Sequence, residues 1–298
     1  MRLVVTGNEG QVVRSLVERA CTTAFEIVPL GRPELDLAAP ASDIEAAVIH
    51  ARPDVLVSAA AYTKVDQAET DEELAFLVNE RGPRALASAA RSVGCPIFHL
   101  STDYVFDGRK SSPYVETDET GPTGVYGASK LAGERAVLEE TDNSVVLRTA
   151  WVYSPFGANF IKTMLRLASE RNEVAIVADQ RGNPTSALDI ADGILRIATN
   201  LRKGAREEQR GIFHMTGAGD ASWADFAEAI FAASAEAGGP VARVKPIRTE
   251  DYPTAARRPA NSRLDSGKLA RIHGVSLPDW HVSMKEVVSR LLQSGQEN

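Results

Sequence analysis

Cysteines, basic clusters and long apolar runs are scarce in this 298-residue sequence, and each shortage argues against a class of protein. The two cysteines, Cys21 and Cys95, are too few for a disulfide framework and fit a reducing cytoplasm. The formal net charge is -7, and no basic cluster could neutralise a phosphate backbone, which argues against nucleic-acid binding. No run approaches the roughly 18 apolar residues of a membrane span. We therefore expect a cytoplasmic protein that binds neither nucleic acid nor membrane.

The sequence does contain a regular alternation of short β-branched segments with amphipathic ones. Strands are predicted at residues 2–6, 25–30, 35–37, 54–58, 95–100 and 145–147, with helices at residues 13–20, 44–50 and 72–93 and from about residue 125. Such alternation is typical of a parallel sheet with helices on both faces. We predict a Rossmann-type doubly wound NADP-binding domain at residues 1–153 and a smaller, interleaved substrate-binding domain at residues 154–298. Residues 211–216 are predicted to return to the main sheet.

A glycine turn follows the first predicted strand. Gly7 and Gly10 are spaced as Gly-x-x-Gly, and a helical pattern begins near Val13. This is the context of a dinucleotide fingerprint, because glycines let the backbone approach a pyrophosphate at a helix N-terminus that favours anions. Val13 stands where a third glycine is usual, and a plain turn would also explain the two glycines. We favour the cofactor interpretation and expect Gly7, Gly10, Gln11 and Val12 to bind it.

The end of the second predicted strand discriminates between nicotinamide cofactors. A carboxylate there would accept a hydrogen bond from the ribose 2′-hydroxyl of NAD(H). The sequence has Arg32 instead, which could pair with the 2′-phosphate of NADP(H), although a solvated loop charge would explain it equally well. Asp36 and Leu37 follow, and we expect them near the adenine. We predict NADPH as the cofactor and leave NADH open.

Two further strand ends carry residues suited to a ligand. Ala59, Ala60 and Ala61 follow the third long strand, and the next strand ends in a polar cluster that begins at Ser101. Ligands of parallel sheets bind in the crevice beyond the carboxyl ends of the strands, where small residues leave room. Packing against a helix would also account for the alanines. We expect all three to contact the cofactor.

Tyr126 and Lys130 lie four residues apart on a predicted helix, so both side chains can reach one ligand. A tyrosine hydroxyl titrates near about pH 10, and a nearby ammonium lowers that pKa. The pair is therefore a candidate acid–base device that also contacts the cofactor. The spacing is common by chance, and a half-buried tyrosine on a surface helix would explain it too, so the surrounding motifs decide.

Several separated motifs occur in a specific order along the chain. They are Gly-x-x-Gly from Gly7, Ala-Ala-Ala from Ala59, Ser-Thr-Asp-Tyr-Val-Phe-Asp-Gly from Ser101, Val-Tyr-Gly-x-x-Lys-Leu-Ala-Gly-Glu from Val125, Arg-Thr-x-Trp-Val-Tyr from Arg148, Asn-Phe at residues 159–160, Asp-Gln-x-Gly-x-Pro-Thr from Asp179 and Arg-Pro-x-Asn-Ser from Arg258. Together they resemble the extended short-chain dehydrogenase/reductases and, over almost the whole chain, the dTDP-4-dehydrorhamnose reductase family.

The resemblance implies NAD(P)H-dependent reduction of the C4 ketone of dTDP-4-dehydro-L-rhamnose to dTDP-L-rhamnose. Tyr126 would supply the proton, Lys130 would lower the pKa of Tyr126 and hold the nicotinamide ribose, and Thr102 would donate to the carbonyl oxygen. The resemblance also places Asp103, Tyr104, Trp151, Asn159 and Phe160 around the sugar and Arg258 at the nucleotide diphosphate.

Related enzymes define the alternatives. Dehydratases of the superfamily have Thr-Asp-Glu at this strand end, whereas Tyr104 follows Asp103 here, which argues against elimination. Another nucleotide-sugar reductase or epimerase remains open, because its Ser/Thr-Tyr-Lys set would look the same. Outside enzymes, a non-catalytic NADP-binding regulatory subunit is the alternative, and the intact Thr102, Tyr126 and Lys130 argue against it.

Some family members form dimers around Mg²⁺ that is held by two glutamates. Ser15 and Leu188 stand at those positions here, and Asp189 is adjacent to the second one. We therefore predict no metal site, and either a monomer or a homodimer.

Overall fold

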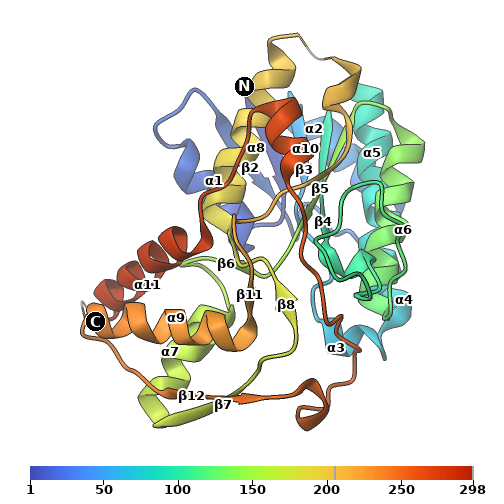
Figure 1. Cartoon of the computed structure of the whole chain (residues 1–298). Coiled ribbons are helices and arrows are strands. Elements are labelled where there is room, and N and C mark those ends of the chain that lie inside the picture. The colour runs from blue at the N-terminus through green and yellow to red at the C-terminus, as the bar shows by residue number, and fades with distance from the viewer. Residues whose placement is uncertain (205, 297–298) are drawn as a thin grey trace.

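A six-stranded parallel sheet organises the larger part of the molecule (Figure 1). The computed structural model describes residues 1–204 and 206–296. In spatial order the strands are β10 (Gly211–His214), β5 (Ser144–Thr149), β4 (Ile97–Thr102), β3 (Val55–Ser58), β1 (Arg2–Thr6) and β2 (Glu26–Leu30). Every neighbouring pair is parallel. The predicted doubly wound Rossmann-type fold is confirmed.

Helices cover both faces of the sheet because its strand residues alternate between two apolar cores. Leu3 and Val5 of β1 belong to one core, and Val4 between them belongs to the other. The helices of the first core are α1 (Gln11–Ala20), α8 (Ala187–Arg202) and α10 (Gly267–His273), and those of the second are α2 (Ala41–Ala51), α5 (Gly82–Val93) and α6 (Val125–Glu140). Burial on both faces explains why these strands are almost continuously apolar.

The smaller part of the molecule lies below the sheet in Figure 1 and is built mainly from the second half of the chain. Its helices are α7 (Phe160–Glu170), α9 (Trp223–Glu236) and α11 (Trp280–Gln296), and its strand pairs are β7 (Glu173–Val177) with β12 (Arg243–Ile247), β6 (Val152–Tyr153) with β9 (Thr185–Ser186), and β8 (Arg181–Gly182) with β11 (Ala221–Ser222). Tyr153, Phe226 and Trp280 pack ring against ring at its centre.

The second half of the chain also returns to the main sheet. Residues 211–216 were predicted to do so, and β10 pairs in parallel with β5. Helices α8 and α10 pack on the same face of that sheet. The boundary at residue 153 between two domains stays a prediction.

Short helices connect the third and fourth strands. They are α3 (Val65–Ala68), α4 (Glu72–Phe76) and a π-helical turn (Leu77–Arg81) that runs into α5. The helix predicted at residues 72–93 is therefore present, with a widened turn in its middle. Elsewhere in the described residues, 3-10 turns occur at Asp103–Val105, Glu207–Gln209 and Thr249–Asp251.

The strand predicted at residues 35–37 is wrong. The segment is a turn in which the Leu35 amide donates to Gly31 and the Ala39 amide donates to Asp36. Leu35 and Leu37 are buried against α2 and α5, so their alternation with a polar residue comes from core packing without strand pairing. As a consequence β2 is the edge of the sheet, and the switch point of the strand order lies between β1 and β3. The other predicted strands and helices are confirmed, with ends that differ by a few residues.

Among the described residues, no helix is both long enough and apolar enough to cross a membrane.

Candidate active site

Two adjoining pockets open at the switch point of the sheet. The outer pocket has a volume of about 850 Å³ and the inner pocket about 440 Å³. The outer pocket is lined by Gly7, Asn8, Glu9, Leu30, Gly31, Arg32, Leu35, Asp36, Leu37, Ala38, Ala60, Ala61, Tyr62, Thr63, Lys64, Leu74 and Val78. The inner pocket is lined by Thr6, Gly7, Glu9, Gly10, Gln11, Val12, Val13, Ala59, Ala60, Ala61, Thr63, Leu100, Ser101, Tyr126, Lys130, Thr149, Val152, Gly157 and Ala158. Every residue predicted to bind the cofactor lines one of the two.

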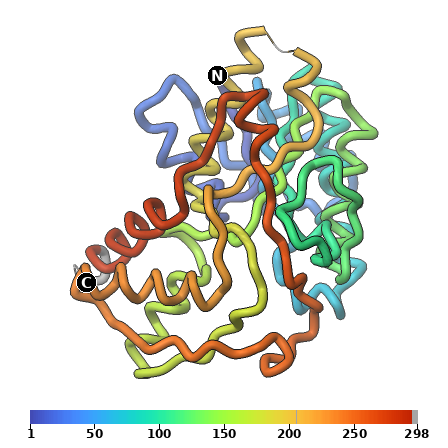
Figure 2. The backbone as a smooth tube through the Cα atoms, in the orientation of Figure 1, coloured from blue at the N-terminus to red at the C-terminus, as the bar shows by residue number. Residues whose placement is uncertain are grey.

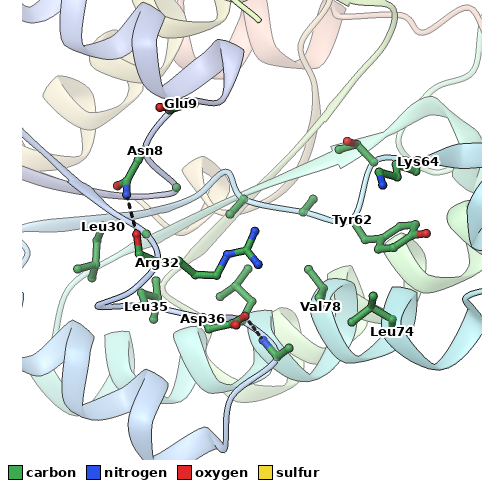
Figure 3. A pocket seen from close by; sticks show the side chains of 17 residues that line it. Asn8, Glu9, Leu30, Arg32, Leu35, Asp36, Tyr62, Lys64, Leu74 and Val78 are labelled. Atoms are coloured by element: carbon green, nitrogen blue, oxygen red, sulfur yellow. Dashed lines mark hydrogen bonds between the residues drawn. The ribbon is translucent and has the colours of Figure 1, made fainter. Parts of the chain in front are cut away.

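The outer pocket lies between the turn at residues 31–38 and the segment that follows β3. Figure 3 shows the Arg32 side chain extending into it, while Asp36 accepts a hydrogen bond from the Ala38 amide at 2.9 Å. The Asn8 amide fixes the turn by donating to the Arg32 carbonyl at 3.2 Å. Lys64 stands on the opposite wall and is a second cation that the sequence did not single out.

The inner pocket begins at the glycine turn. Gly7 has φ +97°, a conformation that favours glycine, and its amide donates to the Leu30 carbonyl at 2.7 Å. Gly10 precedes α1 without a side-chain cap, and the first turn of α1 has no acidic residue. The helix amides and dipole can therefore receive an anion. The buried Thr149 hydroxyl also lines this pocket and has no hydrogen-bond partner among the described residues. These features fit a dinucleotide.

Tyr126 enters the inner pocket from the first turn of α6, beside the end of β4. Burial raises the pKa of Tyr126 to about 12, and this rise exceeds the opposing effect of a hydrogen bond with Thr102. The phenol therefore holds its proton at neutral pH, as a proton donor must. The sequence led us to expect a pKa lowered by Lys130; the pKa is raised instead, because burial of the phenol outweighs the effects that lower it.

Lys130 points from α6 towards the end of β4, where its ammonium donates to the Leu100 carbonyl at 2.7 Å. Burial lowers the pKa of Lys130 to about 8, and the carboxylate of Glu134 opposes that shift. Glu134 forms a fully buried bidentate pair with Arg148, with distances of 2.9 and 2.7 Å, and also accepts a hydrogen bond from the Ser101 hydroxyl. Through Glu134, Arg148 and Ser101, these hydrogen bonds connect α6, β5 and β4 directly behind the pocket.

Glycines set the depth of α6. A Cβ atom at Gly127 would collide with the carbonyl oxygen of Tyr104, and one at Gly133 would collide with that of Asn79. The Val125 amide at the helix start donates to the Glu69 carboxylate at 2.9 Å. Close packing and this cap therefore fix the position of Tyr126 relative to β4.

Asp103 and Tyr104 continue from β4 next to Tyr126. The rings of Tyr104 and Tyr126 meet edge to face with 5.7 Å between their centroids. Burial raises the pKa of Asp103 to about 6, although the Ser262 and Thr102 hydroxyls lie near enough to lower it. Thr102 donates to one oxygen of Asp103 at 3.0 Å, while Oδ2 has no hydrogen-bond partner in the described chain.

Trp151 lies in a layered aromatic contact. It has φ +48°, which is rare for a bulky residue, and its indole stacks on Trp223 with 3.6 Å between centroids and 7° between planes. A Cβ atom at Gly182 would collide with the same indole. Trp223 was missed, because a tryptophan at the start of an apolar helix looks like an ordinary core residue in the sequence.

Asn159 and Phe160 make contacts within the protein. The Asn159 side chain caps α7 by accepting from the Lys162 amide, and it donates to Gln11 at 3.1 Å and to the Ser154 carbonyl at 2.8 Å. Phe160 packs against Trp223. These contacts connect the first helix to the smaller part of the molecule, and the predicted contacts of both residues with a sugar stay predictions.

Arg258 forms a bidentate ion pair with Asp66, at 2.8 and 3.2 Å. The pKa of Arg258 is raised. Burial lowers this pKa, but the hydrogen bond with Asp66 and the nearby Tyr104 phenol together raise it by more. Asp66 was not singled out, since a single carboxylate in a short helix has no distinguishing pattern in the sequence.

The positions considered for a metal are separate from these pockets. The Ser15 hydroxyl donates to the Gln11 carbonyl, Leu188 is buried in the core, and Asp189 accepts from Ser283 at 2.6 Å. In the described part of the chain, no group of three or more His, Cys, Asp or Glu residues is arranged to hold a metal ion.

Comparison with known proteins adds to this geometry. A family model described as the RmlD substrate binding domain matches residues 1–293. The chain is 49% identical over 297 residues to a dTDP-4-dehydrorhamnose reductase of Sinorhizobium fredii, with 100% of both chains covered. The solved dTDP-4-dehydrorhamnose reductase of Clostridium acetobutylicum superposes with a TM-score of 0.90 at 36% identity, over 98% of this chain and 100% of that one. The Bacillus anthracis enzyme, solved in complex with NADP, gives 0.88 at 36% identity, over 96% and 98%.

Proposed function

The chain belongs to the RmlD family of dTDP-4-dehydrorhamnose reductases, and on that premise we propose that it reduces the C4 ketone of dTDP-4-dehydro-L-rhamnose with NADPH. The family and the oxidoreductase class confirm the resemblance that the motifs indicated. The observation that carries the proposal is the position of Tyr126 and Lys130, which lie in the same pocket as the glycine turn.

NADPH would occupy both pockets. The adenosine half would lie in the outer pocket, where Arg32 and Lys64 are the cations available to its 2′-phosphate. The pyrophosphate would meet the amides that follow Gly10, and the nicotinamide half would lie between Ala59 and Lys130 in the inner pocket. A family member solved in complex with NADP supports NADPH as a cofactor, and the Arg32→Ala comparison below tests NADH.

Bound NADPH would supply a hydride to the carbonyl carbon of the sugar. The Thr102 hydroxyl at the end of β4 would donate to the carbonyl oxygen, where negative charge develops. Tyr126 would then transfer its phenolic proton to that oxygen, so the ketone gains one hydride and one proton and becomes an alcohol. The Lys130 ammonium would stabilise the phenolate that remains, before solvent restores the proton.

The remaining predicted contacts are those with the substrate. Tyr104 contacts Tyr126, and Arg258 lies beyond Tyr104. We propose that Asp103, Tyr104 and Trp151 contact the sugar, with Asn159 and Phe160 behind them. Arg258 would bind the diphosphate, because a dianion needs cationic or amide donors.

The test is oxidation of NADPH by the purified protein with dTDP-4-dehydro-L-rhamnose, followed by the loss of nicotinamide absorbance. We expect turnover that requires both compounds, with dTDP-L-rhamnose as the product. A rate no higher than that of a blank without enzyme would contradict the assignment and would favour a cofactor-binding regulatory subunit. Turnover with other nucleotide-linked 4-ketosugars alone would favour a reductase of different specificity.

A further inference from the structure

We propose that Asp66 is a positioning residue for the nucleotide diphosphate of the substrate, because it holds Arg258 and the backbone around it against the wall of the cofactor site. The inference rests on the proposed function, in which Arg258 binds that diphosphate. Asp66 itself would not contact the substrate and would act through Arg258.

The contacts of Asp66 reach across the molecule. Its Oδ1 accepts from the Ala256 amide at 3.0 Å and from Arg258 Nη1 at 3.2 Å, and its Oδ2 accepts from Arg258 Nη2 at 2.8 Å. Three hydrogen bonds therefore join one carboxylate to a segment 190 residues later in the chain. Figure 2 shows the orange segment before the last two helices passing beside the cyan segment that contains Asp66.

The pairing leaves Arg258 able to bind an anion. Asp66 uses one N–H of each terminal nitrogen, and a guanidinium has five N–H donors in a rigid plane. The Nε–H and the two outer N–H groups remain available for phosphate oxygens. A bidentate carboxylate fixes the plane of the guanidinium, so those donors keep one direction and lose less rotamer freedom when the diphosphate binds.

The position of Asp66 connects Arg258 to the cofactor. Asp66 follows Thr63 and Lys64, which line the outer pocket, and it lies in the first turn of the short helix α3. Three residues later, Glu69 caps the helix that carries Tyr126. One short segment thus sets the distance between the proposed diphosphate ligand, the cofactor wall and the proposed proton donor.

The ion pair is partly buried at Arg258 and exposed at Asp66. Arg258 is 24% exposed and Asp66 is 45% exposed, so the pair is shielded more than an ion pair in open solvent. The pKa of Asp66 is lowered, first by its hydrogen bond with Arg258. The pair is therefore formed throughout the neutral range in which the proposed reaction would run.

The experiment measures the affinity of NADPH-saturated protein for dTDP by calorimetry in four proteins: wild type, Asp66→Ala, Arg258→Ala and the double variant. We expect Asp66→Ala to weaken dTDP binding by at least about tenfold, a loss within the range of a charge-assisted contact. The double variant should bind dTDP no more weakly than Arg258→Ala alone, because Asp66 acts through the arginine. In Asp66→Ala the loss should appear in the KM for the dTDP-sugar, while the kcat at saturating sugar and the affinity for NADPH stay within about twofold of wild type.

A matched control removes another carboxylate that holds the same segment. Asp179 accepts from the amide of Thr249 at 2.9 Å and from its hydroxyl at 2.7 Å, without contacting Arg258. Asp179→Ala should therefore leave dTDP affinity unchanged. Asp66→Asn, which keeps an acceptor for the Ala256 amide but loses the charge, should weaken dTDP binding and serves if Asp66→Ala fails to fold.

The outcomes separate this inference from the proposed function. Unchanged dTDP affinity in both Asp66 variants would refute the positioning role, and tighter binding would show that Asp66 competes with the ligand. Additive losses in the double variant would show that Asp66 does not act through Arg258. Failure of the wild-type protein to bind dTDP would instead contradict the proposed function.

Discussion

Replacing Asp103 with asparagine should stabilise the folded protein at neutral pH, because this carboxylate is ionised in a place that disfavours charge. Asp103 is 2% exposed, and burial raises its pKa from 3.8 to about 6. A shift of that size corresponds to about 3 kcal/mol of lost stability once the carboxyl is ionised in both states. Asparagine keeps an oxygen that can accept from Thr102 but places an uncharged amide group at Oδ2, so we expect a gain of roughly 1–3 kcal/mol.

The stability penalty of Asp103 should increase with pH, as the folded and unfolded pKa values of this carboxyl show. Below the unfolded pKa near 3.8 both states hold the proton and Asp103 carries no penalty. Between the unfolded pKa and about pH 6, the unfolded chain has lost its proton while the folded carboxyl still holds it, so the folded state loses stability as the pH rises. Above about pH 6 the folded carboxyl is ionised as well, and the loss of stability is complete. The stability advantage of Asp103→Asn should therefore be small near pH 4 and largest above pH 6.

Urea unfolding of both proteins at about pH 4 and about pH 7.5 measures this difference, since other groups titrate equally in the two proteins. Asp118 provides a control of opposite sign, because its hydrogen bond with Lys110 lowers its pKa. Asp118→Asn should lose stability at neutral pH relative to wild type. The reasoning would be refuted if Asp103→Asn were no more stable than wild type at neutral pH. A difference in unfolding free energy of the same size at both pH values would also refute it.

Three further predictions address the cofactor and the chemistry. Tyr126→Phe should lower kcat by at least about a hundredfold while NADPH still binds, because it removes the proton donor and leaves the pocket shape intact; near-wild-type turnover in a stopped-flow assay would exclude this role. Arg32→Ala should weaken NADPH binding by about tenfold and NADH binding much less, measured by fluorescence titration, since only NADPH carries a 2′-phosphate; equal losses would show that Arg32 does not read that phosphate. Treatment with a chelator should change neither activity nor the mass measured by light scattering, and a clear loss of either would reveal a metal site.

The sequence predicted the strands and helices of the first half of the chain well, because most patterns there fit only one kind of local structure. The strand at Arg2–Thr6, the turn at Gly7 and the helix that follows each satisfy local rules, and the structure adds only their exact ends. The strand prediction at residues 35–37 was wrong because leucines that alternate with a polar residue also suit a turn that places two side chains between helices. Periodicity reports which residues are buried, and it does not report whether the backbone pairs with a neighbour.

The residues that line the two pockets were more predictable than those around Trp151 and Arg258. Residues such as Gly10 and Lys130 lie at sheet ends or on one helix face, so short-range spacing identifies them. Trp223, Asp66 and the pairing of Arg258 depend on contacts between segments that are distant in the chain. No local pattern specifies such contacts, and only the tertiary structure brings them together.

The most direct test of the account is to follow the hydride itself. The protein would be given dTDP-4-dehydro-L-rhamnose and NADPH that carries deuterium at the transferable position of the nicotinamide, and the product sugar would be examined by NMR. The account predicts dTDP-L-rhamnose with one deuterium at C4 and none elsewhere in the sugar. Deuterium at another carbon, or a product that lacks it, would contradict reduction of the C4 ketone.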